Sequence, residues 1–376
     1  DAGISNLVNQ FGAGSKTALL VTLIVVFSAI GGFLGWIEVL IPFVPLVVAV
    51  VLALGYDSMT AVAVCTVGTM GGFLAGPTNL YTVGICNSTL QKLGLISQSG
   101  DLFPGLGLRI AVWGIITLTS VIYIAIYAQK TYKNPEKSLV AGIDTSDIKA
   151  DNSDSAVRPL TIRHSLVLLS ILGAMILTII GMKIGFNGVT WGIDDVSAIF
   201  FLSGIFSAFV GRMKAGETAN AFLTGAKASI GGAMIVGVAR GVYWVLDAGQ
   251  VNATIIFKTT ELLRGTSPFL AAAGIVLIVS LINGLIPSGS GKAALLSPIL
   301  VPIGVNLGLS TQTSVLAYQF GDGITNMAWF TYGTLLIFLN YGKVPLNKWY
   351  RFIMPLIGIF FLIAFLVLAV ALKIHY

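Results

Sequence analysis

The chain has 376 residues, of which 56% are hydrophobic and only 10% are charged, and its formal net charge is +6. Its mean hydropathy is +0.93. Soluble domains carry about 25% charged residues, so these values exclude a water-soluble globule, a disordered chain and an ordinary cytosolic enzyme. They indicate an all-α polytopic membrane protein. The positive charge requires no nucleic-acid partner, because Lys and Arg also mark cytoplasmic loops.

Apolar segments follow one another along the chain, and several are shorter than the about 20 residues that a spanning helix needs. Short segments between Gly, Pro and Ser clusters predict re-entrant hairpins and broken helices, because non-helical backbone at membrane depth survives only where protein or a water-filled cavity surrounds it. The segments run over 17–34, 39–54, 58–76, 80–95, 108–128, 164–182, 196–211, 228–247, 268–284, 293–307, 313–320, 328–341 and 352–373.

The polar stretch 129–163 divides these segments into two groups. Its Lys and Arg residues make it a cytoplasmic linker in a multi-pass membrane protein. Counting crossings outward from this linker gives two repeats. The first, 1–128, contains an inner hairpin (17–54), a broken helix (58–95) and a helix (108–128). The second, 164–376, contains scaffold helices (164–247), an interfacial helix (250–264), an outer hairpin (268–307), a broken helix (313–341) and a helix (352–373).

The two hairpin regions match each other at a constant offset of 253 residues, as Gly55 and Gly308 illustrate. The crossing count gives the copies opposite orientations, so the match predicts an inverted repeat, the pattern of secondary transporters. A further match joins residues 1–3 to 247–249, each ahead of an expected membrane-surface helix. It predicts that the parent protein has further helices before residue 1.

The sharpest motif is Pro287-Ser-Gly-Ser-Gly-Lys-Ala293, at the predicted tip of the outer hairpin. Glycines free backbone groups to face a ligand, serine hydroxyls donate and accept, and the lysine adds positive charge. The helix that follows would favour a carboxylate at its N-terminus. A Walker phosphate loop is excluded, because Ile286 and Ala293 stand where it needs Gly and Ser or Thr. A tight turn without a ligand is the structural alternative. The candidate substrate-binding residues here are Ser288, Gly289, Ser290, Gly291 and Lys292.

A second motif, Gln319-Phe-Gly-Asp-Gly-Ile-Thr-Asn326, is expected to interrupt the following helix. An ionisable residue inside the membrane is a functional-site hypothesis by default. Opened carbonyls beside a carboxylate would suit a sodium ion, and Asp322 would alternatively carry a proton. An interfacial loop with Asp322 as a helix cap is the structural alternative. We predict ion-binding residues Gln319, Gly321, Asp322 and Thr325, a possible sodium site at Ser290, Gly321 and Asp322, and a substrate contact at Asn326.

The first repeat offers a corresponding break over 66–79, which has hydroxyl and amide side chains but no charge. In the tip of the inner hairpin, Glu38 lies between apolar residues. It would bind a cationic group of the substrate, help a coupling ion, or form a purely structural ion pair. The candidates from this repeat are Thr66 and Thr69 for the ion, and Trp36, Glu38, Asn79 and Thr82 for the substrate.

Longer runs carry a family resemblance. The chain resembles the anaerobic dicarboxylate carrier and putative basic amino acid antiporter family of the ion transporter superfamily in Pro287-Ser-Gly-Ser-Gly-Lys-Ala, Gln312-Thr-Ser-Val-Leu-Ala-Tyr-Gln-Phe-Gly-Asp-Gly-Ile-Thr-Asn326, Leu54-Gly-Tyr-Asp57, Asn79-Leu-Tyr-Thr-Val-Gly84 and Ala239-Arg-Gly-Val242. The resemblance implies an elevator-type fold with an inverted repeat, two opposed re-entrant hairpins and two broken transmembrane helices. It also implies a homodimer through the scaffold helices, a substrate between the hairpin tips and the breaks, and coupling to Na⁺ or H⁺ or exchange.

These observations favour a secondary active transporter for a small charged metabolite. The predicted site contains both signs of charge, Glu38 and Asp322 against Lys292, which favours an amino acid and in particular basic amino acid exchange or uptake. A dicarboxylate transporter of the same fold is the alternative, and a channel is the second. An enzyme is not expected, because the sequence contains no Ser/His/Asp set, metal-ligand cluster or paired catalytic carboxylates. We expect no cofactor beyond the coupling ion.

Overall fold

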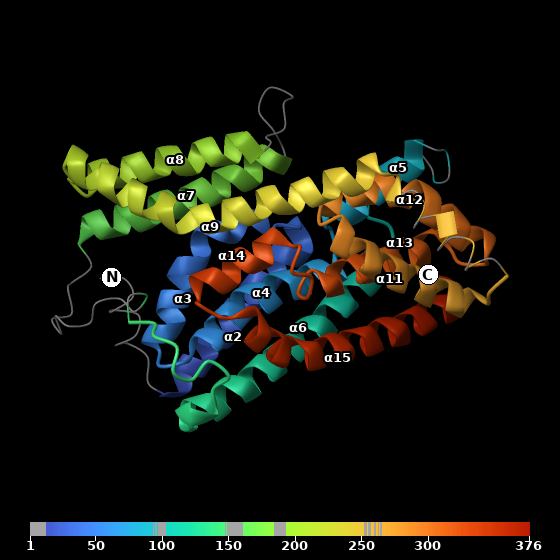
Figure 1. The fold of residues 1–376 in the computed structure, drawn as a ribbon, viewed down its shortest axis with the longest axis horizontal. Helices are drawn as coiled ribbons and strands as arrows, with labels where there is room; N and C mark the ends of the chain where they lie inside the picture. The colour runs from blue at the N-terminus through green and yellow to red at the C-terminus, as the bar shows by residue number, and fades with distance from the viewer. Residues whose placement is uncertain are drawn as a thin grey trace. The chain divides into compact units, whose positions relative to one another are not determined.

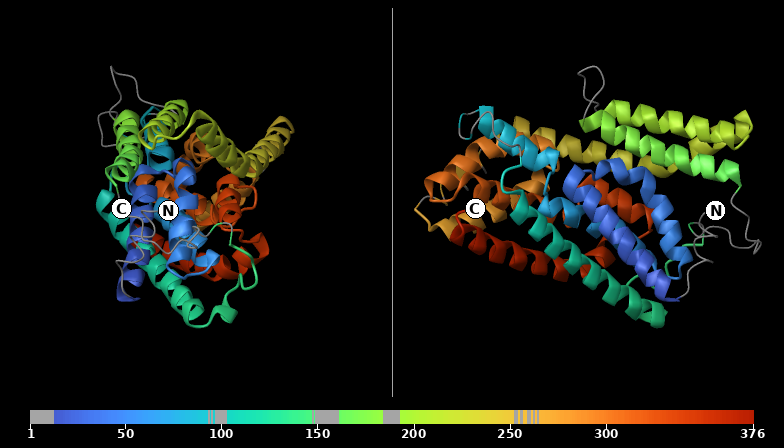
Figure 2. Two further views of the ribbon diagram at one scale, coloured as in Figure 1. Left: turned by 90° about the vertical axis from the view of Figure 1, so that its left-hand side faces the viewer. Right: turned by 180° about the vertical axis from the view of Figure 1, so that it is seen from behind.

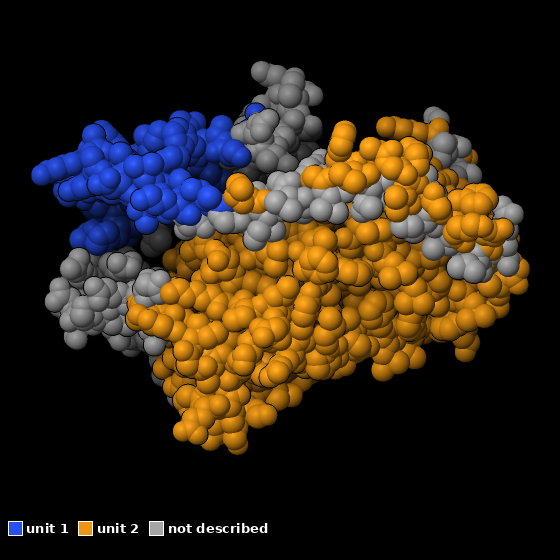
Figure 3. Space-filling model, in the orientation of Figure 1, with its two compact units in different colours: residues 1–13, 149–230 blue, residues 14–148, 231–376 orange. Residues whose placement is uncertain are grey.

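The computed structural model describes residues 13–92, 94, 96, 103–146, 148, 161–183, 193–251, 254, 257, 258, 261, 263 and 265–376. Every regular element within these residues is a helix (Figure 1). The surface helices expected at the start of the chain and at 250–264 lie mostly outside the described residues. The chain forms two compact units, residues 1–13 with 149–230 and residues 14–148 with 231–376 (Figure 3).

The smaller unit contains α7 (Ile162–Lys183), α8 (Ile193–Val210) and the beginning of α9 (Ala215–Ala248). α7 and α8 pack side by side, and the hydroxyl oxygens of Ser170 and Ser207 are 2.9 Å apart. Phe201 of α8 meets Phe222 of α9 edge to face, with ring centroids 5.9 Å apart. These helices correspond to the first three apolar segments that were predicted after the linker.

The larger unit contains two helical hairpins and the helices around them (Figure 2). Its first part consists of α2 (Ala13–Ala29), the π-helical turn η1 (Ile30–Leu34), the 3-10 helix η2 (Glu38–Phe43), α3 (Val44–Ala53), α4 (Ser58–Ala75), the π-helical turn η3 (Leu80–Gly84), α5 (Ile85–Lys92), α6 (Leu106–Lys133) and η4 (Pro135–Lys137). Its second part, after the end of α9, consists of α11 (Pro268–Leu285), α12 (Gly289–Asn306), α13 (Thr311–Thr325), α14 (Gly333–Tyr341) and α15 (Leu346–Lys373).

The core of this unit is the contact between α4 and α13. Every residue of α4 is buried, and so is α13 from Thr313 to Thr325. Glycines let the two helices approach closely, because a Cβ on Gly323 would lie 2.4 Å from the Cα of Leu74. On another face of α4, a Cβ on Gly72 would lie 1.9 Å from the carbonyl oxygen of Ser28. Interiors are too densely packed to absorb such overlaps, so these glycines are packing positions.

The helix breaks lie later in the sequence than predicted. The first was expected over 66–79, but α4 stays helical to Ala75 and only 76–79 separates it from η3. The second was expected over 319–326, but α13 continues to Thr325 and the connection to α14 spans 326–332. Glycines inside the helices, such as Gly72 and Gly323, admit neighbouring helices, whereas Gly76 has a φ of 49° and ends α4. The Thr325 hydroxyl also donates to the Gly321 carbonyl at 2.9 Å, a bond to residue i−4 that a helix accommodates.

Two long helices show apolar side chains on their outer faces. Those of α6 are Ile110, Ile115, Leu118, Ile122 and Ile126, and those of α15 are Met354, Ile359, Leu362, Leu366 and Val370. Within the described residues, 5 helical stretches are long and apolar enough to cross a membrane: Lys16–Leu34, Ser58–Lys92, Leu106–Lys133, Pro268–Leu285 and Leu346–Lys373. Outward apolar rows of this length are expected on helices that face lipid.

Candidate functional site

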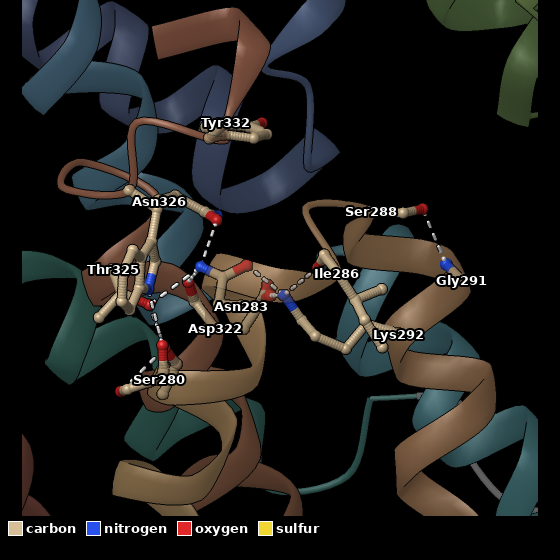
Figure 4. A network of polar contacts seen from close by, with 12 residues as sticks. Ser280, Asn283, Ile286, Ser288, Gly291, Lys292, Asp322, Thr325, Asn326 and Tyr332 are labelled. Carbon is tan, nitrogen blue, oxygen red and sulfur yellow. Dashed lines mark hydrogen bonds and ion pairs between the residues drawn. The ribbon is translucent and has the colours of Figure 1, made fainter. Parts of the chain in front are cut away.

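A buried ion pair joins the second hairpin to α13. The Nζ of Lys292, in the first turn of α12, lies 2.5 Å from Oδ1 of Asp322, and both side chains have no exposed surface (Figure 4). The sequence placed Asp322 in an unwound segment, whereas the structure holds it within α13. A charge without water must be paired, because desolvation of an isolated ion costs several kcal/mol, on the order of 5. Each of these residues therefore depends on the other.

Asn283 of α11 organises the polar groups around this pair. Its Oδ1 accepts a hydrogen bond from Lys292 Nζ. Its Nδ2 lies 3.0 Å from the carbonyl oxygen of Asp322, 2.9 Å from Thr325 Oγ1 and 2.8 Å from Asn326 Oδ1 (Figure 4). The sequence reasoning missed Asn283. The sequence does contain an indication of its role: Asn283 is an amide side chain within the apolar run Leu281-Ile-Asn-Gly284, and a buried amide needs hydrogen-bond partners.

The tip of the second hairpin is shorter than the motif indicated. Only Ile286–Ser288 lie between α11 and α12, because α12 begins at Gly289. Ser288 caps this helix and accepts a hydrogen bond of 3.2 Å from the Gly291 amide. A Cβ on Gly289 would lie 3.7 Å from Thr82 Cγ2 and 4.0 Å from Asp322 Oδ2. The N-terminus of α12 therefore faces both η3 and α13.

The predicted residues of the first break divide into two groups. Thr82 is buried beside the tip of the second hairpin, and Asn79 is buried beside the first, where a Cβ on Gly35 would lie 2.3 Å from Asn79 Oδ1. Thr66 and Thr69 are buried within α4, and Thr69 donates to the Cys65 carbonyl at 2.7 Å. The structure therefore brings Asn79 and Thr82 to the hairpin tips, while the hydroxyl of Thr69 forms a hydrogen bond within α4.

Two of the three predicted sodium ligands, Gly321 and Asp322, have partners within the protein. The carbonyl of Gly321 accepts hydrogen bonds from Ser280 at 3.2 Å and from Thr325 at 2.9 Å. Asp322 faces Lys292, and Ser290 lies in the first turn of α12. Gln319 donates through Nε2 to the carbonyl of Phe73 and thus joins α13 to α4. The unwound segment expected at Asp322 is wrong, because α13 stays helical to Thr325, and the carbonyl of Asp322 accepts from Asn283 Nδ2.

The tip of the first hairpin reaches the connection after α13. Tyr332 donates a hydrogen bond of 2.8 Å to Glu38 Oε1. Tyr332 is buried, whereas Glu38 is exposed. Trp36 is buried at the same tip. The structural alternative of an ion pair for Glu38 finds no support among the described residues, because its hydrogen-bond partner is a neutral phenol.

Several buried polar atoms on these elements have no hydrogen-bond partner among the described residues. They are Asp322 Oδ2, Tyr318 OH, Gln319 Oε1, Asn79 Nδ2, Thr66 Oγ1 and Thr82 Oγ1. Leaving such an atom unsatisfied costs about 1–3 kcal/mol. The two hairpin tips, η3 and α13 thus present charged and polar groups beside one another in a largely apolar protein, an arrangement suited to a polar solute.

An all-helical protein with several membrane-length helices and a polar centre at two hairpin tips belongs to the class of membrane transporters. Residues 1–373 match the family described as DcuC, C4-dicarboxylate anaerobic carrier, and the chain belongs to this family. It is therefore a carrier and not an enzyme. The family resemblance that was read from the sequence is confirmed.

Individual relatives agree with this class. The chain is 29% identical to the "Putative basic amino acid antiporter YfcC" of Escherichia coli K12, over 97% of this chain and 71% of that protein. It is 23% identical to a "Putative short-chain fatty acid transporter" of Haemophilus influenzae, over 73% of this chain and 61% of that protein. The fold is similar to that of the crystal structure of the Alcanivorax borkumensis YdaH transporter, with a TM-score of 0.52 at 18% identity over 100% of this chain and 81% of that chain.

Proposed function

We propose that this protein is a secondary active transporter for amino acids with a cationic side chain. The observation that carries the proposal is the Lys292–Asp322 ion pair, because it neutralises the cation of the site and leaves Glu38 uncompensated. With one positive and two negative side chains, the site favours a solute that brings positive charge. The proposal agrees with the name of the Escherichia coli relative.

The two hairpin tips would hold the two ends of such a solute. Glu38 is exposed and positioned by Tyr332, so its second oxygen can accept from an ammonium or guanidinium group. The α-carboxylate would lie at the N-terminus of α12, where Ser290 and the exposed Gly291 are next to the Ser288 cap. Thr82 of η3 and Asn79, which caps η3, would supply hydrogen bonds, since each keeps an unpartnered buried atom among the described residues.

A dicarboxylate is the second candidate, because the family description names C4-dicarboxylates. Two carboxylates would need Lys292 as their counter-charge, and Lys292 is engaged by Asp322. Protonation of Asp322 would release it. Under this alternative Asp322 carries the coupling proton; sodium remains the other coupling ion that we consider.

For the transport mode we propose an elevator movement of two inverted repeats in the bacterial inner membrane, with exchange of one amino acid for another. Local features that recur 253 residues apart support the repeat. Gly55 and Gly308 have φ values of 93° and 92°. Asp57 caps α4 through the Thr60 amide, and Ser310 caps α13 through the Thr313 amide. We further propose that the protein forms a homodimer through its scaffold helices α7, α8 and α9.

The test is uptake by proteoliposomes that contain the purified protein. Vesicles loaded with unlabelled arginine or ornithine are compared with vesicles loaded with succinate, each against external labelled arginine and labelled succinate. We expect arginine uptake that requires internal arginine or ornithine. Uptake of succinate alone would establish the dicarboxylate alternative. Unitary currents in planar bilayers would overturn the carrier mechanism in favour of a channel.

A further inference from the structure

Two of the membrane-length helices, α6 and α15, leave an aliphatic slot between them. The slot has a volume of about 300 Å³, and the side chains that line it are all aliphatic, among them Leu108, Val112, Ile363, Val367 and Val370. Protein interiors contain few voids larger than a water molecule, and water does not settle in a cavity that offers it no polar partner. A hydrocarbon group is therefore the occupant that the walls of the slot favour.

The slot is held open because α6 and α15 are connected on either side of it. Toward the end of α6, Tyr123 donates to the Phe352 carbonyl at 2.5 Å, and the two rings meet edge to face with centroids 5.2 Å apart. Beyond the other end of the slot, the Tyr376 hydroxyl donates to the carbonyl of Gly105 at 3.0 Å. Between these contacts the rim of the slot is exposed, at Ala111, Ile115, Leu366 and Val370. The slot therefore opens on the outer faces of both helices.

The size of the slot decides which apolar group fits it. The outer faces of α6 and α15 carry the apolar rows that are expected against lipid, so the mouth of the slot faces lipid. A helix is about 10 Å across and fills roughly 400 Å³ in one turn, which exceeds the volume of the slot. A single acyl chain is thinner than a helix and consists of hydrocarbon alone. The slot thus fits one acyl chain and not a helix of another protein.

The slot lies within one half of the membrane and ends beside a lysine. Its residues on α6 precede the middle of that helix, and those on α15 follow the middle of α15. Lys373 is exposed, lies about 20 Å along α15 from the middle of the helix, and follows Val370 by three residues on the same face. Half of a hydrocarbon core is about 15 Å thick. In a helix centred in the bilayer, Lys373 therefore reaches the level of the lipid phosphates.

We propose that the slot between α6 and α15 binds one acyl chain of an anionic phospholipid, whose phosphate pairs with Lys373. The aliphatic walls hold the chain, and the lysine selects the headgroup, because a cation near an anionic headgroup favours binding. The bound chain fills the gap between the two helices where their side chains do not meet. The lipid site is separate from the proposed transport site, since its residues belong to neither hairpin tip and to neither η3 nor α13.

Native mass spectrometry of the full chain tests the lipid site. The protein is delipidated in detergent and then supplied with phosphatidylglycerol or phosphatidylcholine. Ala111→Phe fills the slot, and the lipid-bound fraction should fall at least about tenfold, the factor that displacing two methylene groups represents. The matched control is Leu118→Phe, at an exposed position of α6 outside the slot, which should retain the lipid. Phosphatidylglycerol should also raise the melting temperature of the parent and of Leu118→Phe but not that of Ala111→Phe.

The headgroup contact has its own test, which does not depend on how Ala111→Phe folds. Lys373→Gln should weaken binding of phosphatidylglycerol about fivefold and leave binding of phosphatidylcholine unchanged, whereas Lys130→Gln, at the opposite end of α6, should change neither. Equal lipid binding by Ala111→Phe and Leu118→Phe, or equal effects of the two lysine variants, would overturn the proposal. Loss of a protein dimer in Ala111→Phe, without loss of lipid, would show that a second copy of the chain covers the slot and would also refute it.

Discussion

Tyr332 and Glu38 are joined by a hydrogen bond of 2.8 Å although 294 residues separate them in the sequence. The bond connects the tip of the first hairpin to the connection between α13 and α14. At the tip of the second hairpin, Gly289 faces Thr82 of η3 and Asp322 of α13. Each hairpin tip thus contacts the interrupted helix of the other half of the chain, and the charged groups of the proposed transport site lie at these contacts.

The buried ion pair makes a stability prediction. Asp322→Asn should lower the free energy of unfolding by about 3–5 kcal/mol, because it leaves the Lys292 charge buried without a partner. Thermal unfolding of the purified protein, followed by tryptophan fluorescence, measures the change. The matched control is the double variant Asp322→Asn with Lys292→Met, which removes both charges and should recover most of the loss. A single variant as stable as the parent would contradict the pairing.

The role of Glu38 predicts a loss of affinity for basic amino acids. Glu38→Gln can still accept from Tyr332 but lacks the negative charge, so the concentration of arginine at half-maximal uptake should rise about tenfold or more, given the 1.5–3 kcal/mol of a charge-assisted bond. Proteoliposome uptake gives this value. Tyr332→Phe keeps the charge and serves as the control with a smaller effect. If Tyr332→Phe raised the arginine concentration at half-maximal uptake more than Glu38→Gln does, Glu38 would not be the residue that binds the cationic group.

The amide of Asn283 should be needed for the geometry of the site. Asn283→Ala removes the acceptor of Lys292 and the donor to Asp322, Thr325 and Asn326. Leaving such buried groups unsatisfied costs about 1–3 kcal/mol each, so we expect lower thermal stability and loss of uptake. Asn340→Ala, at an exposed position of α14, is the control and should change neither. Normal uptake by Asn283→Ala would show that the hydrogen bonds of Asn283 are not required for transport.

The close packing of α4 predicts opposite effects for two glycine substitutions. A methyl group on Gly72 would overlap the Ser28 carbonyl oxygen at 1.9 Å, whereas a Cβ on Gly114 of α6 has no neighbour within 4 Å. Gly72→Ala should therefore destabilise the protein by about 1–3 kcal/mol or more. Gly114→Ala should stabilise it by up to about 1 kcal/mol through helix propensity. Melting temperatures of the two variants in the same detergent test this, and equal shifts would contradict the close contact.

Composition and the spacing of apolar segments determined the class of protein and the approximate position of its described helices. A lipid-facing helix must satisfy its backbone internally and show apolar side chains along its length, and both requirements are local properties of the sequence. The Pro287–Ala293 motif likewise predicted a hairpin tip with a helix after it, because glycine, serine and proline act through the residues beside them.

The tertiary structure decided what the polar and small residues inside the helices do. Glycine in an apolar run permits either an unwound segment or a close helix contact, and only the neighbour across the contact distinguishes them. Gly323 against Leu74 is such a contact, so α13 remains helical where the sequence predicted a break. The partner of Asp322 could not be read from the sequence for the same reason: whether a buried carboxylate meets an ion or Lys292 depends on which helices pack together, and that depends on residues far apart in the chain.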